Sequence, residues 1–177
     1  QTKKGTPTMG GILMFIPLII SSLLWVDLYN QYVLVVLFVM VCFGILGFAD
    51  DYLKVSKRNT KGVPGKVKLI VQFLVALVAT FWIQCFADTA HASHLLFPFF
   101  KSWIINLGWF YVPFAMVVMV GASNAVNLTD GLDGLAIGPI MIATACFAII
   151  AYLTGNIKFA EYLQIHFVSG TGELTVL

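Results

Sequence analysis

Two adjacent carboxylates, Asp50 and Asp51, directly follow a long apolar stretch and stand shortly before Lys54. At the C-terminal end of a helix, acidic side chains are disfavoured by the helix dipole, and two close carboxylates repel each other unless a cation lies between them. The plain alternative is a solvated helix end, in which Lys54 offsets part of the repulsion. The pair therefore indicates either a Mg²⁺ site or a carboxylate that acts as a base.

A second polar segment, residues 124–136 with the sequence NAVNLTDGLDGLA, stands between two other apolar stretches. Amide and carboxylate groups suit hydroxyls, uracil edges or a hydrated Mg²⁺, and glycines such as Gly131 allow a ligand to approach the backbone closely. A short polar loop with glycine turns explains the composition equally well. The residues of interest in this segment are Asn124, Asn127, Asp130, Gly131, Leu132 and Asp133.

A third segment, residues 3–11 with the sequence KKGTPTMGG, combines two lysines with two threonine hydroxyls and flexible glycines. Lys3 and Thr8 are suited to binding phosphate. A basic anchor for anionic lipid at the membrane surface is an equally good explanation. The segment lacks the spacing of a Walker loop.

The composition of the chain requires lipid as its solvent. Of its 177 residues, 60% are hydrophobic and only 10% are charged, with a mean hydropathy of +0.95. Soluble domains carry about a quarter charged residues. The apolar runs lack strand-like alternation, so we predict an all-α polytopic transmembrane helix bundle in a single domain. Five spans are expected at residues 10–26, 32–49, 67–86, 107–126 and 136–154, with the possible start of a sixth at residues 173–177.

The charges predict the orientation of this bundle. Eight of the ten basic residues lie before the first span or near the segment between the second and third spans. Because cytoplasmic loops carry the excess of Lys and Arg, segments 1–9, 50–66 and 127–135 are expected on the cytoplasmic side. The far-side segment 87–106, with His91 and His94, is expected to be a wet loop or an interfacial helix rather than a metal site.

All three polar segments therefore fall on one face of the membrane. Lysines for phosphates, paired carboxylates for Mg²⁺ and an Asn/Asp loop together suggest phosphoryl transfer at the membrane surface. An ion-coupled transporter is the main alternative from the residues alone, although it predicts charges within spans rather than at their ends. A structural scaffold gives no reason for clustered Asp and Asn on one face.

The three segments, in their order along the chain (residues 3–11, 48–54 and 124–136), resemble those of the phospho-N-acetylmuramoyl-pentapeptide transferases. These enzymes belong to the polyprenyl-phosphate N-acetylhexosamine-1-phosphate transferase superfamily. The resemblance implies a bacterial inner-membrane protein of about ten helices that works as a homodimer without a nucleic-acid partner. It would transfer phospho-MurNAc-pentapeptide from UDP-MurNAc-pentapeptide to undecaprenyl phosphate with Mg²⁺, giving lipid I and UMP. A sister enzyme that transfers GlcNAc-1-phosphate would share the aspartates.

The resemblance also implies roles for individual residues. Asp50 would prepare the lipid phosphate oxygen, and Asp51 would hold Mg²⁺ or phosphates. The other positions carried over are Lys3, Thr8 and Lys54 for phosphates or nucleotide sugar, Asn127 and Asp130 at the catalytic centre, and Gly131, Leu132 and Asp133 at the uridine. Asn124 is also counted among the substrate-binding residues. Direct attack by the lipid phosphate is favoured over a covalent aspartyl intermediate, because the phosphate is already a nucleophile.

Two parts of the family pattern do not occur in this sequence. They are a later aspartate tied to Mg²⁺ and a histidine-rich cytoplasmic loop. A C-terminal truncation explains this better than divergence. On that basis the main Mg²⁺ ligand is expected beyond residue 177, and these 177 residues alone are expected to be inactive.

Overall fold

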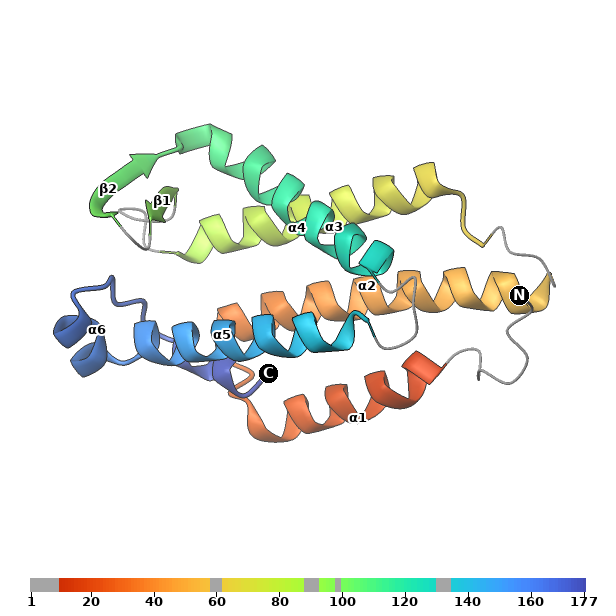
Figure 1. The fold of residues 1–177 in the computed structure, drawn as a ribbon, viewed down its shortest axis with the longest axis horizontal. Coiled ribbons are helices and arrows are strands. Elements are labelled where there is room, and N and C mark those ends of the chain that lie inside the picture. The colour runs from red at the N-terminus through yellow and green to blue at the C-terminus, as the bar shows by residue number, and fades with distance from the viewer. Residues whose placement is uncertain (1–9, 58–61, 88–92, 98–99, 130–134) are drawn as a thin grey trace.

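The computed structural model describes residues 10–57, 62–87, 93–97, 100–129 and 135–177. Long helices that run along one common direction dominate the molecule, and a small sheet and a short helix lie at one end (Figure 1). The long helices in this described part are α1 (Gly10–Trp25), α2 (Gln31–Ser56), α3 (Gly65–Phe86), α4 (Tyr111–Thr129) and α5 (Ile137–Gly155). The shorter elements are β1 (His94–Phe97), β2 (Phe100–Asn106), α6 (Ile157–Leu163) and two 3-10 helices, Gly108–Phe110 and Thr171–Thr175.

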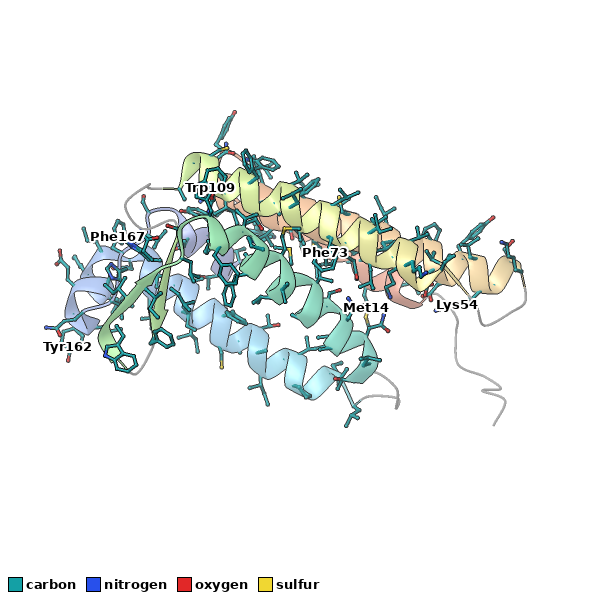
Figure 2. The ribbon with its side chains drawn as sticks, turned by 90° about the horizontal axis from the view of Figure 1, so that it is seen from above. Met14, Lys54, Phe73, Trp109, Tyr162 and Phe167 are labelled. Carbon is teal, nitrogen blue, oxygen red and sulfur yellow. The ribbon has the colours of Figure 1, made fainter. Side chains whose placement is uncertain are left out.

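The helices confirm the predicted all-α membrane bundle. Four of them, among the residues described, are long and apolar enough to cross a membrane: α2, α3, α4 with its preceding 3-10 turn, and α5. Large apolar side chains project outward along their length (Figure 2). A bundle with a small core and a broad apolar exterior is what a lipid environment requires.

The helix ends differ from the predicted spans in two places that matter for function. Helix α2 continues beyond the predicted end at residue 49 to Ser56, and α4 continues beyond residue 126 to Thr129. The reason is that hydropathy marks where the hydrocarbon ends, whereas backbone hydrogen bonds carry a helix into water. In the described part of the chain, α1 has 16 residues, fewer than the ~20 that a perpendicular span needs.

Within the segment predicted to lie on the far side, residues 94–97 and 100–106 form two paired strands rather than the predicted loop or interfacial helix. Strands β1 and β2 pair antiparallel, with His94 opposite Asn106 and Leu95 opposite Ile105. Aromatic and β-branched residues in β2, such as Trp103 and Ile104, favour the extended conformation. The prediction of a loop or helix was therefore wrong for these two strands.

The C-terminal residues pack back onto the bundle. The 3-10 helix Thr171–Thr175 lies against α5. It forms at residues where the start of a sixth span was expected. A Cβ at Gly155 would collide with the backbone of Gly172, so the close approach depends on glycine. Asn30 fastens the same region to α2, since its Oδ1 accepts from the Tyr32 amide at 2.9 Å while its Nδ2 donates to the Gly170 carbonyl at 2.7 Å.

Candidate functional site

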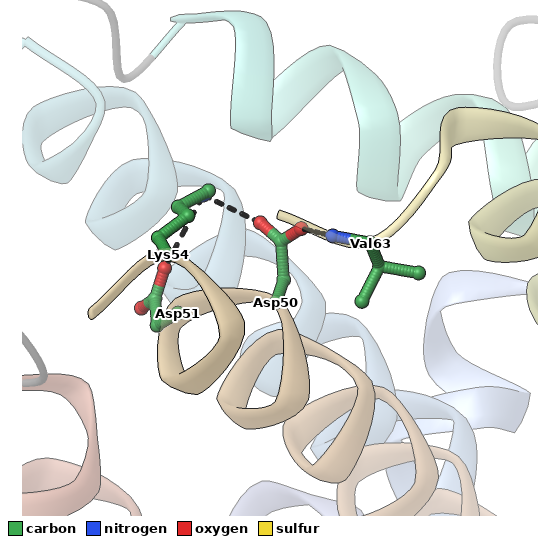
Figure 3. A network of polar contacts seen from close by, with 4 residues as sticks. All are labelled: Asp50, Asp51, Lys54 and Val63. Carbon is green, nitrogen blue, oxygen red and sulfur yellow. Dashed lines mark hydrogen bonds and ion pairs between the residues drawn. The ribbon is translucent and has the colours of Figure 1, made fainter. Parts of the chain in front are cut away.

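The paired carboxylates lie on the last turns of α2, where one lysine holds both. Lys54 Nζ is 2.5 Å from Asp50 Oδ2 and 3.4 Å from Asp51 Oδ1 (Figure 3). Helical spacing explains this arrangement, because residues three and four positions apart lie on the same side of a helix. The cluster keeps one net negative charge, which the partial negative charge of the helix C-terminus reinforces.

The two carboxylates have different surroundings. The Asp50 side chain is 17% exposed, whereas the Asp51 side chain is 52% exposed. The second Asp50 oxygen, Oδ1, accepts a hydrogen bond from the Val63 amide at 2.8 Å, just before α3 begins (Figure 3). Asp50 is therefore fixed in orientation by groups from two elements, while Asp51 remains accessible to a ligand.

Gly62 allows the backbone before α3 to approach the Asp50 side chain closely. Its backbone has φ of +45°, a left-handed conformation that favours glycine. An added Cβ would collide with Asp50 Oδ1 and would lie 2.9 Å from Lys54 Cε. Sequence reasoning missed both Gly62 and Val63 as neighbours of the carboxylates. A glycine shortly before a proline in a polar turn was the available signal.

An apolar groove between α1 and α2 leads to Asp51. It has a volume of about 460 Å³. Helix α1 touches α2 closely at Gly44, where a Cβ would collide with the Phe15 ring. At Gly11 and Gly47, by contrast, an added Cβ would meet no described atom within 4 Å. The groove is lined by Gly11, Ile12, Phe15, Gly47, Phe48 and Asp51, among others.

The structure places the two asparagines of α4 differently from each other. Asn124 faces α3, where its Nδ2 donates to Gln72 Oε1 at 2.8 Å and to the Val120 carbonyl at 2.8 Å. Asn127 is exposed on the last turn of α4. The remaining predicted site residues, Lys3, Thr8, Asp130, Gly131, Leu132 and Asp133, lie outside the described residues. The role of Asn124 in substrate binding stays a prediction.

Comparison with known protein families shows the family to which the chain belongs. The family described as Glycosyl transferase family 4 matches residues 33–172, which include both Asp50–Asp51 and the segment 124–136. The chain belongs to glycosyl transferase family 4. Signature 1 of the phospho-N-acetylmuramoyl-pentapeptide transferases also matches, at residues 3–15. The two matches together support a polyprenyl-phosphate sugar-1-phosphate transferase of the phospho-N-acetylmuramoyl-pentapeptide transferase family.

Proposed function

We propose that this chain transfers phospho-MurNAc-pentapeptide from UDP-MurNAc-pentapeptide to undecaprenyl phosphate, giving lipid I and UMP. The observation that carries this proposal is the Asp50–Asp51–Lys54 cluster at the end of a membrane helix, beside an apolar groove that reaches Asp51. A reaction between a lipid phosphate and a soluble nucleotide sugar needs a polar site next to an apolar channel. The match to signature 1 favours the muramoyl-pentapeptide donor over the GlcNAc donor of the sister enzymes.

The reaction exchanges one phosphorus–oxygen bond for another. An oxygen of the lipid phosphate attacks the sugar-linked phosphorus of the nucleotide sugar, and the bond from that phosphorus to the UMP oxygen breaks. Lys54 would stabilise the charge on the phosphates, and the oriented Asp50 would contact or deprotonate the lipid phosphate. The groove between α1 and α2 would hold the isoprenoid chain next to its phosphate.

Asp50 and Asp51 fit a magnesium ion by their chemistry. Mg²⁺ is commonly held by one or two carboxylates together with substrate phosphates and waters. Within the described part of the chain, no group of three or more His, Cys, Asp or Glu side chains could hold a metal by itself. Asp51, the more exposed carboxylate, would be the first protein ligand. When bound, the ion would neutralise negative charge on the reacting phosphates.

The proposed setting is the bacterial inner membrane, with the carboxylate end of the bundle in the cytoplasm and the protein as a homodimer. Lys54 lies toward one end of the molecule, and Trp109, Tyr162 and Phe167 lie toward the other (Figure 2). The excess of basic residues near the Lys54 end supports the cytoplasmic assignment. Val63→Cys and Ser93→Cys, each in a background without Cys42, Cys85 and Cys146, would test this orientation by labelling with a membrane-impermeant reagent in intact and in opened cells.

The deciding experiment uses full-length protein in detergent with Mg²⁺ and undecaprenyl phosphate. UDP-MurNAc-pentapeptide and UDP-GlcNAc are offered separately, and UMP release is measured together with lipid-linked product. Asp50→Asn is compared with Asp27→Asn, which changes a carboxylate outside the carboxylate cluster, in the turn between α1 and α2. We expect turnover of the muramoyl donor only, lost in Asp50→Asn and kept in Asp27→Asn. Turnover of UDP-GlcNAc would indicate the sister activity, and turnover of neither would favour a transporter.

A further inference from the structure

Helix α3, which is largely apolar, contains a buried glutamine. Gln72 is only 2% exposed, and it is followed on the same helix by the fully buried small residues Ala76 and Ala79. Small residues at a helix contact allow two membrane helices to approach closely. Burial of an amide is unfavourable unless both its donor and its acceptor find partners.

Both ends of the Gln72 amide find those partners on α4. Gln72 Oε1 accepts from Asn124 Nδ2 at 2.8 Å, and Gln72 Nε2 donates to Ser123 Oγ at 3.4 Å. Asn124 Nδ2 also donates to the Val120 carbonyl, one turn earlier on its own helix. One side chain of α3 is therefore hydrogen-bonded to two consecutive residues of α4. This contact specifies both the rotation of α4 and its position along the axis of α3.

The same two helices carry parts of the proposed site. Helix α3 begins two residues after Val63, whose amide donates to Asp50, and α4 carries Asn127 one turn after Asn124. A slip of α4 by one turn would move its end by about 5.4 Å. Apolar packing alone tolerates such slips better than a paired amide does, because apolar contacts have no direction.

We propose that Gln72 is a positioning residue, which acts through Asn124 to fix the end of α4, with Asn127, relative to Asp50. This inference rests on the proposed function only for its kinetic consequence, since the placement of the helices can be measured without turnover. It gives Asn124 a role in helix placement rather than in substrate contact. Gln72 carries no chemistry of its own, because it lies within the contact between the two helices.

An exchange of the two amide lengths tests the proposal in the full-length protein. Gln72→Asn shortens one side chain and Asn124→Gln lengthens the other, so the double variant restores the distance between the helices. We expect each single variant to lower kcat between about tenfold and a hundredfold with KM nearly unchanged, which is the effect of small displacements in an active site. The double variant is expected to recover most of kcat. Gln84→Leu, toward the opposite end of α3, is the control and keeps full activity.

A second measurement separates this proposal from the proposed function. Spin labels at Lys66→Cys and Leu128→Cys, in a background without Cys42, Cys85 and Cys146, report the distance between the start of α3 and the end of α4. We expect a broadened or shifted distance in Gln72→Leu and the original distance in the double exchange. Unchanged distances in Gln72→Leu would overturn the proposal, whatever substrate the enzyme uses. A double variant as impaired as Asn124→Gln alone would also overturn the proposal, because that result would make Asn124 a substrate contact.

Discussion

Lys54 Nζ lies 2.5 Å from Asp50 Oδ2, one helical turn along α2, and the same ammonium reaches Asp51 at 3.4 Å. One cation therefore serves two carboxylates at a helix end that is itself partly negative. In the proposed site, this shared ion pair would balance the attraction for a metal cation against the attraction for phosphate. Changes to either partner should move the two affinities in opposite directions.

Lys54→Met tests that balance. Removal of the ammonium leaves the two carboxylates unopposed, so the site should bind Mg²⁺ more tightly and phosphates more weakly. We expect kcat/KM to fall about 10-fold to 100-fold, the equivalent of one charge-assisted hydrogen bond. The Mg²⁺ concentration for half-maximal UMP release should fall as well. Lys54→Arg keeps the charge and is the control. A higher Mg²⁺ requirement in Lys54→Met would contradict this account of the cluster.

Gly62→Ala tests the hydrogen bond that orients Asp50. The new methyl group would occupy space next to Asp50 Oδ1, on a backbone whose φ of +45° is unfavourable for alanine. The strain is of order 1–3 kcal/mol. We expect loss of most activity as the Val63 amide moves away from Asp50. The matched control is Gly65→Ala, where an added Cβ meets no described atom within 4 Å. Equal activity in both variants would show that Val63 does not matter for catalysis.

Gly47→Leu tests the groove between α1 and α2. An added Cβ at Gly47 would meet no described atom within 4 Å, and Gly47 lines the groove, so we expect the leucine side chain to enter the groove. We expect KM for undecaprenyl phosphate to rise about tenfold, roughly 1.4 kcal/mol, while KM for the nucleotide sugar stays the same. Gly121→Leu makes the same change on α4, away from the groove. If both variants bind the lipid as well as the wild type does, the isoprenoid chain lies elsewhere.

Asn30→Ala tests the contact that holds the C-terminal segment to the start of α2. The change removes a helix cap and the hydrogen bond to the Gly170 carbonyl. We expect a loss of about 1–2 kcal/mol in the free energy of unfolding, measured in detergent, with activity per folded molecule unchanged. Asn30→Asp keeps the capping oxygen but not the donor to Gly170, so its stability should lie between that of the wild type and that of Asn30→Ala. An unfolding temperature equal to that of the wild type in Asn30→Ala would mean that neither bond contributes.

Much of this protein could be predicted from its sequence, because a lipid bilayer allows few backbone structures. Long apolar runs must become helices in a bilayer, and the positions of α2 to α5 follow from them. The side chains of Asp50, Asp51 and Lys54 could be grouped as well, because they are neighbours along a single helix. The segment 124–136 carried recognisable chemistry, although its residues 130–134 lie outside the described residues.

The tertiary structure decided how separate helices meet. The local sequence does not show that the Val63 amide donates to Asp50, that Phe15 packs against Gly44, or that Gln72 is hydrogen-bonded to Asn124. The hairpin at β1 and β2 was also missed, because short segments rely on cross-strand pairing that hydropathy does not encode. The sequence by itself thus determined the membrane class and the chemistry available at each helix end. The rotation and depth of each helix, which bring those ends together, depend on side-chain packing across the bundle and required the structure.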